Sequence, residues 1–312
     1  MPRAAIIDCD PGTDDAIAIW LALASPELDV RLVSVVGGNV GLQRTVANAC
    51  AIVALSGRAV PVVAGAGRAL LGGFEDAAYV HGDDGLGGVV LPPGAAPQAG
   101  HAVDAMRALL RAAEPDSVTL VGIGPATNLG LLLATEPALA DRVAEIVLMT
   151  GAWSEGNVTP SAEFNAWNDP EALAIVMACG RPITLATLDV TNQALCRPEH
   201  IASLRGAVLR AASQGACARA TADIWASVRP SRRSGGQGHE QHDACAVMWL
   251  VAPHLFTHQP AHVSVECAGI GRGRTVVDRW QRQDAAPNAT LLETVDADGF
   301  FAVLIERLAG LP

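Results

Sequence analysis

The segment Asp8-Cys9-Asp10-Pro11-Gly12-Thr13-Asp14-Asp15 carries four carboxylates in eight residues, where an apolar strand-like run gives way to a helix-like one. One or two acids at such a point are common as caps of a helix start. Four exceed what capping needs, because like charges this close raise one another's pKa values unless a cation neutralises them. Clustered carboxylates suit hard cations. The segment therefore predicts a metal site.

Further polar groups follow later strand-like runs. They are the Asn39 amide after Gly37-Gly38, the turn 122–128, the acids and amides Glu155, Asn157, Glu163 and Asn165, and the pair His242-Asp243 before an apolar run. Each group alone is ordinary turn chemistry. Because all of them fall at expected strand ends or helix starts, we expect them to lie close together.

The elements that must position these groups alternate between short β-rich runs and Ala/Leu-rich helical runs. Strands are expected at 4–7, 30–36, 61–64, 117–121, 145–149 and 183–188, with helices at 14–24, 46–55, 103–113, 127–135 and 170–178. The stretch 65–100 is expected to be loop with small helical pieces, and the chain beyond 188 mostly helical to 253. Strand-like runs at 261–266 and 289–294 then precede a final helix. This alternation predicts one α/β domain over residues 1–312, an open, mostly parallel (mixed) sheet with helices on both faces and ligands at the carboxyl ends of its strands.

Composition and charge exclude several classes of protein. The net charge of −11 argues against a nucleic-acid partner, which needs a basic face. All 21 basic residues are arginine, so chemistry that requires lysine is excluded. The seven scattered cysteines form no C-x-x-C pair and are expected to be buried free thiols. An acid at position 8 and no long apolar run argue against a signal peptide or membrane span, so a cytoplasmic protein is expected.

Taken together, these motifs resemble those of the inosine-uridine preferring nucleoside hydrolase family over about residues 4 to 250. The opening Asp-Cys-Asp-Pro-Gly-Thr-Asp-Asp is similar to the family signature, and Ala162-Glu163-Phe164-Asn165 is the other specific match. Weaker matches are Gly38-Asn39, His81-Gly82, Gly124–Asn128, Gly156–Pro160, Asn168-Asp169-Pro170 and His242-Asp243.

The resemblance implies a Rossmann-like nucleoside hydrolase fold and a Ca²⁺-dependent N-ribohydrolase. The Ca²⁺ ligands it implies are Asp10, Asp15, Asp243 and the backbone carbonyl of Thr127, with Asp10 also acting as general base on a water molecule. It implies a ribose site formed by Asp14, Asn39, Asn157, Glu163 and Asn165. His242 is the candidate that protonates the departing base, and His81 is expected near the base. A homodimer or homotetramer is also implied.

Three alternatives stay open. A haloacid-dehalogenase-like phosphohydrolase would use Asp8 as nucleophile, but that chemistry also needs a lysine. A non-catalytic, calcium-dependent nucleoside- or ribose-binding protein would need the same residues as the hydrolase. His242 has a structural interpretation as well, as a cap of the helix that follows it.

The chain departs from the family pattern in two places. Thr150-Gly151-Ala152 stands where paired glycines are more usual. The segment Ser213–Gln241, which is expected to contribute to the base side and carries Trp225 and the Arg/Gly-rich loop 229–241, does not align. We expect this loop to be mobile and to close over the site. Its arginines could also meet an anionic group such as a 5′-phosphate.

Overall fold

The computed structural model describes residues 2–210, 215–231 and 233–311. Nine strands form one sheet in the order β10-β9-β11-β6-β5-β4-β1-β2-β3. The parallel part comprises β1 (Arg3–Cys9), β2 (Leu28–Val35), β3 (Val62–Ala64), β4 (Val118–Gly122), β5 (Val143–Met149), β6 (Ile183–Ala186) and β11 (Ala289–Val295). The α/β fold with a mostly parallel mixed sheet predicted from the sequence is confirmed.

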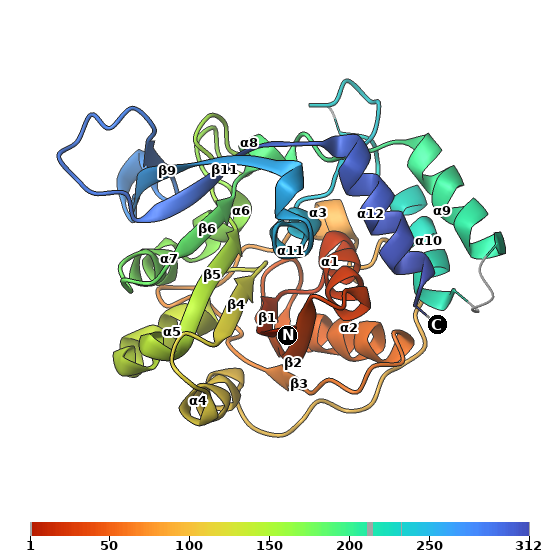
Figure 1. Cartoon of the computed structure of the whole chain (residues 1–312), viewed down its shortest axis with the longest axis horizontal. Helices are drawn as coiled ribbons and strands as arrows, with labels where there is room; N and C mark the ends of the chain where they lie inside the picture. Colours follow the sequence, from red (N-terminus) through yellow and green to blue (C-terminus); the bar gives the residue numbers. More distant parts are fainter. Residues whose placement is uncertain (1, 211–214, 232, 312) are drawn as a thin grey trace.

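Two groups of helices cover the sheet, one on each face (Figure 1). One group contains α1 (Thr13–Ala24), α2 (Leu42–Leu55), α10 (Ala216–Ser227), α11 (Asp243–Val251) and α12 (Ala297–Ala309). The other contains α4 (Ala102–Ala112), α5 (Thr127–Thr135) and α7 (Pro170–Met177). The shorter helices are α3 (Ala78–His81), α6 (Phe164–Asn168) and α8 (Leu188–Thr191), while α9 (Pro198–Arg210) packs on α10 and α12. Each face thus has its own apolar core, as a sheet buried on both sides requires.

The register of the central strands places their carboxyl ends side by side. Asp8 of β1 pairs with Ser34 of β2 on one side and with Gly122 of β4 on the other. Gly122 in turn pairs with Leu148 of β5. The residues that follow these strands therefore meet at one edge of the sheet, where ligands bind in open α/β sheets.

The C-terminal part departs from the expected layout. β9 (Phe256–Val265) begins five residues before the predicted run, and a strand not predicted, β10 (Thr275–Asp278), pairs with it antiparallel. β11 runs parallel to β6 and antiparallel to β9, so it lies between them. A separate two-stranded sheet joins β7 (Leu195–Cys196) and β8 (His239–Glu240). The predicted strand 183–188 ends at Ala186, and its last residue begins α8.

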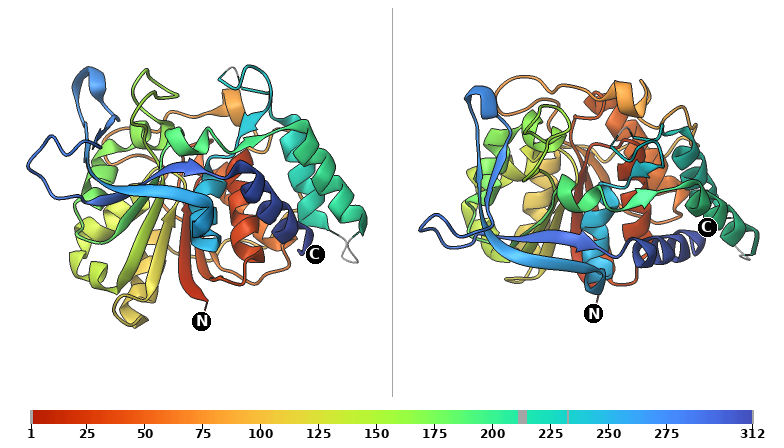
Figure 2. Two further views of the ribbon diagram at one scale, coloured as in Figure 1. Left: turned by 45° about the horizontal axis from the view of Figure 1, so that its top comes forward. Right: turned by 90° about the horizontal axis from the view of Figure 1, so that it is seen from above.

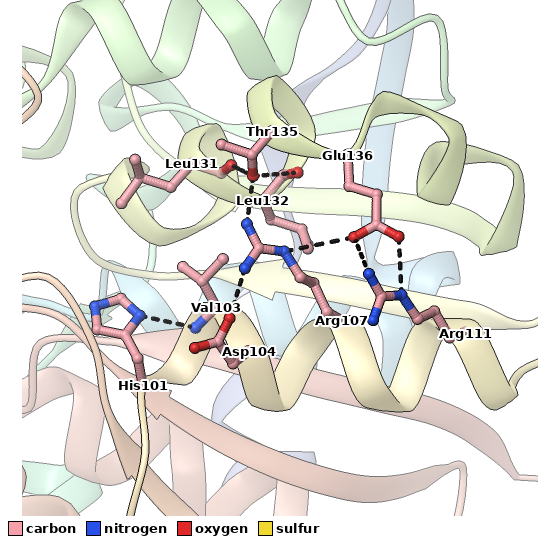
Figure 3. A network of polar contacts seen from close by, with 9 residues as sticks. All are labelled: His101, Val103, Asp104, Arg107, Arg111, Leu131, Leu132, Thr135 and Glu136. Carbon is pink, nitrogen blue, oxygen red and sulfur yellow. Dashed lines mark hydrogen bonds and ion pairs between the residues drawn. The ribbon is translucent and has the colours of Figure 1, made fainter.

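Hydrogen bonds and ion pairs connect α4 with the C-terminal end of α5 (Figure 3). Glu136 pairs with Arg111 at 2.7 Å and with Arg107 at 3.5 Å, and Arg107 also donates to Thr135. Because these side chains are partly exposed, the contacts orient the two helices more than they stabilise the fold.

The remaining expectations concern loops and thiols. The stretch 65–100 is loop with one short helix, α3, as predicted. All seven cysteines are free; Cys179 and Cys267 are half-buried and the other five are buried. No helix in the described part of the chain is long and apolar enough to cross a membrane.

Candidate active site

A cavity of about 620 Å³ opens at the carboxyl edge of the sheet. The segment containing α3 and the segment around β8 both lie at this end of the molecule (Figure 2). Eight of the residues predicted from the sequence line it, namely Asp14, Asn39, His81, Asn157, Glu163, Asn165, His242 and Asp243. The structure thus brings together residues that are up to 229 positions apart in the chain.

An acidic cluster forms where α1 and α11 begin. Asp14, Asp15 and Asp243 offer carboxylate oxygens that all lie within 4.8 Å of one another. Asp15 and Asp243 are buried, and burial together with the neighbouring acids raises the pKa of both carboxyls. Carboxylates held this close out of water are compatible with ionisation only when a cation lies among them.

Asp10 lies beside this cluster and is fully buried. Its Oδ2 accepts a hydrogen bond of 2.7 Å from the Asn39 backbone amide, whereas its Oδ1 is buried and has no partner in the described residues. Burial and the nearby Asp15 charge raise the pKa of the Asp10 carboxyl. A Cβ on Gly38 would lie 2.1 Å from Asp10 Oδ2, and one on Gly124 would lie 2.6 Å from Oδ1. Only glycine at both positions leaves room for this carboxylate.

The donor set fits a hard divalent cation, because it consists of oxygen atoms and includes an orphaned carboxylate oxygen. The close trio contains Asp15 and Asp243 as predicted, together with Asp14, which the sequence assigned to the ribose site. Asp10 is connected to the trio through its backbone amide, which donates to Asp15 at 3.1 Å. Thr127, the fourth predicted ligand, is buried at the start of α5, and its hydroxyl donates to Asp169 at 2.6 Å.

The side chains opposite the cluster are oriented by the backbone. Glu163 accepts hydrogen bonds from the amides of Gly151, Asn165 and Ala166, and burial nevertheless raises the pKa of its carboxyl. Asn165 donates to the carbonyls of Ile123 and Met149. These contacts fix both side chains before any ligand binds.

Asn39 and Asn157 are held in the same way by other groups. The Asn39 amide donates to the backbone carbonyl of Asp10 and to Asp15 Oδ2, at 3.2 and 3.0 Å. Asn157 Oδ1 accepts from the Phe164 amide at 2.9 Å.

Two histidines in the cavity are each anchored by a threonine. His81 Nδ1 accepts from the Thr13 backbone amide at 3.2 Å and lies 2.8 Å from the Thr13 hydroxyl. His242 Nδ1 lies 2.7 Å from the Thr191 hydroxyl. His242 is the N-cap residue of α11, but its side chain makes no capping hydrogen bond. The capping interpretation of His242 is therefore wrong.

Asp8 serves a different purpose from the other acids of its segment. Ser34 Oγ and Asn128 Nδ2 both donate to Asp8 Oδ1, at 2.6 and 2.9 Å, and the residue is not part of the cavity wall. A nucleophile needs a free carboxylate oxygen, so the hydrogen bonds from Ser34 and Asn128 argue against Asp8 as the nucleophile of the phosphohydrolase alternative.

Four further residues of the cavity lie in segments that the sequence singled out, but they were given no individual role. Trp225 and Gln241 form part of the wall, and the indole Nε1 donates to Gln241 Oε1 at 2.8 Å. Thr13 and His239 also line it. The adjacency of His239 to the His242-Asp243 motif was the available signal, but a single histidine in a loop has no pattern of its own.

The Arg/Gly-rich loop contributes two of its arginines to this region. Arg229 lines the cavity. Arg233 donates to the Gly156 carbonyl at 3.0 Å and pairs with Glu155 at 3.6 Å, which connects this loop to the segment that carries Asn157. Arg232 lies outside the described residues.

An acidic cluster suited to a cation, two anchored histidines and fixed amide and carboxylate groups around a cavity are the parts that a metal-dependent hydrolase for a small polar substrate needs. The comparisons with known proteins give the family. The model for "Inosine-uridine preferring nucleoside hydrolase" matches residues 5–302. The chain therefore belongs to the inosine-uridine preferring nucleoside hydrolase family, and it is a hydrolase that acts on N-glycosyl compounds.

Curated relatives and solved structures agree with this assignment. The chain is 44% identical over 316 residues to the pyrimidine-specific ribonucleoside hydrolase RihA of Photobacterium profundum, covering 99% of each chain. It is 42% identical over 306 residues to the protein of that name from Escherichia coli, covering 97% of each. The purine-preferring ribonucleoside hydrolase from Gardnerella vaginalis superposes with a TM-score of 0.90 at 31% identity, covering 99% of this chain and 98% of the other.

Proposed function

We propose that this protein hydrolyses the N-glycosidic bond of ribonucleosides with a bound Ca²⁺ ion, and that Asp10 is the general base. The observation that carries this proposal is Asp10 itself, whose buried Oδ1 has no partner in the described part of the chain and lies near three further carboxylates. A buried carboxylate oxygen without a donor is costly unless a ligand completes it.

Asp10, Asp15, Asp243 and the Thr127 carbonyl are the proposed Ca²⁺ ligands, and the closeness of Asp14 to Asp15 and Asp243 places it at the edge of the same site. When bound, the ion would supply the positive charge that lets these carboxylates stay ionised, and it would lower the pKa of a water molecule. An ionised Asp10 can then accept a proton from that water.

The three asparagine side chains each keep a polar group that can hydrogen-bond a ribose hydroxyl. Asn39 and Asn165 each use the side-chain NH₂ group on protein acceptors, so their Oδ1 atoms remain to accept from sugar hydroxyls. Asn157 uses its Oδ1, so its NH₂ group remains to donate. Asp14 and Glu163 add negative charge, which stabilises a sugar that becomes oxocarbenium-like as the base leaves.

The two anchored histidines are proposed to serve the leaving group. The Thr13 backbone amide can only donate, so His81 Nδ1 must be the acceptor and the neutral ring carries its proton on Nε2. Burial lowers the pKa of His81 and favours this neutral form. His81 can therefore donate a hydrogen bond to the base, and His242 is the proposed proton donor.

Pyrimidine ribonucleosides are the proposed preferred substrates, because the relatives at 42–44% identity are named pyrimidine-specific. The cytoplasmic location and the homodimer or homotetramer stay predictions.

The test is release of free ribose from uridine, cytidine, inosine and adenosine, measured by a reducing-sugar assay with and without a calcium chelator. We expect calcium-dependent release, fastest with the pyrimidines, and a fall in kcat of about 10²–10⁴-fold in Asp10→Asn. Asp8→Asn is the matched control, because Asp8 lies in the same segment but its Oδ1 is already bound by Ser34 and Asn128, whereas Asp10 Oδ1 has no partner in the described residues. No ribose from any nucleoside, in protein shown to hold calcium, would refute the proposal and favour a nucleoside-binding protein.

The same assay with uridine 5′-monophosphate tests the arginines of the loop 229–241. Arg229 lines the cavity and could meet a phosphate, whereas Arg233 is already paired with Glu155. Turnover comparable with that of uridine, reduced in Arg229→Gln, would support a phosphate subsite. Rejection of the monophosphate would end that hypothesis.

A further inference from the structure

His239 is a third histidine in the wall of the cavity, and its imidazole has no hydrogen-bond partner among the described residues. It lies in β8, paired with Cys196 of β7, and is only 7% exposed. Its Nε2 is a buried polar atom without a partner. The other two cavity histidines differ, because each is held by a threonine through Nδ1.

The groups around His239 give its imidazole no hydrogen-bond partner in the described part of the chain. Burial, with a smaller effect of His242 in the same direction, outweighs the acidic Glu240 and Asp14 and lowers the pKa of His239 to about 4. The ring is therefore neutral near pH 7 and offers one donor and one acceptor. Buried polar groups are almost always paired, so the buried Nε2 is expected to bind a partner from outside the chain.

The position of His239 indicates which part of a substrate could supply that partner. The acids and amides proposed for a ribose come from α1 and the segments after β2 and β5. His239 comes from the wall that also contains Trp225, Gln241 and His242. The Trp225 indole N–H is already bound to Gln241, so that ring can present only apolar surface to a ligand. His239 supplies free polar atoms beside it.

We propose that His239 hydrogen-bonds the polar edge of the nucleobase and so helps to select the substrate. This inference rests on the proposed function and deepens it, because it assigns a base contact that the ribose and calcium residues cannot make. The apolar ring of Trp225 together with a neutral donor–acceptor imidazole suits a flat heterocycle that carries carbonyl and N–H groups on its edge.

The experiment compares His239→Phe and His239→Gln with the parent enzyme on uridine, inosine and 4-nitrophenyl β-D-ribofuranoside. The nitrophenyl riboside has the same sugar, but its leaving group has no base edge and departs without protonation. We expect His239→Phe to lower kcat/KM for the nucleosides by about 5- to 100-fold, with little change for the nitrophenyl riboside. His239→Gln retains a donor and an acceptor and should recover part of the loss.

The outcomes separate the two proposals. Equal losses on nucleosides and nitrophenyl riboside would show that His239 acts only in holding the structure, and unchanged nucleoside rates would show that it makes no base contact. Either result overturns the role of His239 and leaves the hydrolase intact. Cleavage of no riboside by the parent enzyme would overturn the proposed function itself.

Discussion

At the scale of single residues, Asp8 is an acid that the fold keeps out of water and that the proposed chemistry does not use. Burial raises the pKa of Asp8 to about 7, even though Ser34 and Asn128 both donate to its carboxylate. Its folded-state pKa therefore lies above the value of 3.8 for an exposed aspartate. The ionised form is the one that the folded protein disfavours.

This raised pKa predicts how stability depends on pH. Folding takes up a proton at Asp8 between about pH 4 and 7, so its favourable contribution is complete below pH 4 and is lost as the pH rises through 7. Asp8→Asn keeps the shape and the acceptor oxygen but cannot ionise. We expect the variant to gain thermal stability relative to the parent as the pH rises from 4 to 8. Thermal unfolding of both proteins in chelator measures this, and parallel pH profiles would contradict it.

The residues of the site differ in whether the sequence alone could predict them. Asp10, Asp14 and Asp15 were predictable because a density of like charge can be seen along the chain. His239 was not, because what singles it out is the lack of a partner in a buried place, which only the folded structure reveals. The different roles of Asp8 and Asp10 also needed the structure, since the two acids are two positions apart in the sequence but contact different groups.

At the scale of elements, Asp169 joins three segments at the edge of the site. It is the N-cap of α7 and accepts from the Ala172 amide at 3.1 Å. Its other oxygen accepts from the Leu70 amide at 2.9 Å and from the hydroxyl of Thr127, the first residue of α5. The carboxylate thus fixes the start of α5, where a calcium ligand is proposed.

Replacing Asp169 should therefore cost more than loss of an ordinary cap. We expect Asp169→Ala to lower the free energy of unfolding by about 3–5 kcal/mol, because two buried donors and one partly buried donor lose their acceptor. Asp296→Ala is the matched control, since Asp296 caps α12 through one bond to the Gly299 amide and should cost about 1 kcal/mol. Denaturant unfolding of the two variants measures the difference. Equal costs would mean that the contacts to Leu70 and Thr127 contribute nothing.

The parallel part of the sheet could be predicted element by element, and the C-terminal part could not. Helix 127–135 and strands such as 145–149 have strong local apolar patterns between clear turn signals. β9 and β10 depend instead on pairing: β9 is extended to Phe256 by its ladder with β11, and β10 exists only as the partner of β9. Their exposed residues, such as Thr257 and Val276, weaken the local apolar pattern.

At the scale of the whole molecule, the acidic cluster connects ion binding to stability. Asp10, Asp15 and Asp243 are buried and repel one another, so the folded protein without a cation carries an unfavourable interaction. A cation that binds the folded state alone stabilises it by mass action.

We expect calcium at about 100 times its Kd to raise the free energy of unfolding by about 2.7 kcal/mol, measured as a higher Tm than in chelator. Asp15→Asn should reduce this calcium effect, yet raise the Tm in chelator, because it removes one of the repelling charges. An unchanged Tm in calcium would contradict a calcium site, and a lower Tm of the variant in chelator would contradict the repulsion.

The place of β11 in the sheet also has a consequence for how the chain is made. β6 has β5 on one side and β11 on the other, and β11 begins only at Ala289. On the ribosome, all the proposed site residues have therefore been synthesised by Asp243 while β6 still presents an open edge. Such an edge can pair with a strand of another nascent chain. Residues 289–312 thus complete a sheet after all the proposed site residues have been synthesised. A chain that stops before them is expected to associate with its copies rather than act on a substrate.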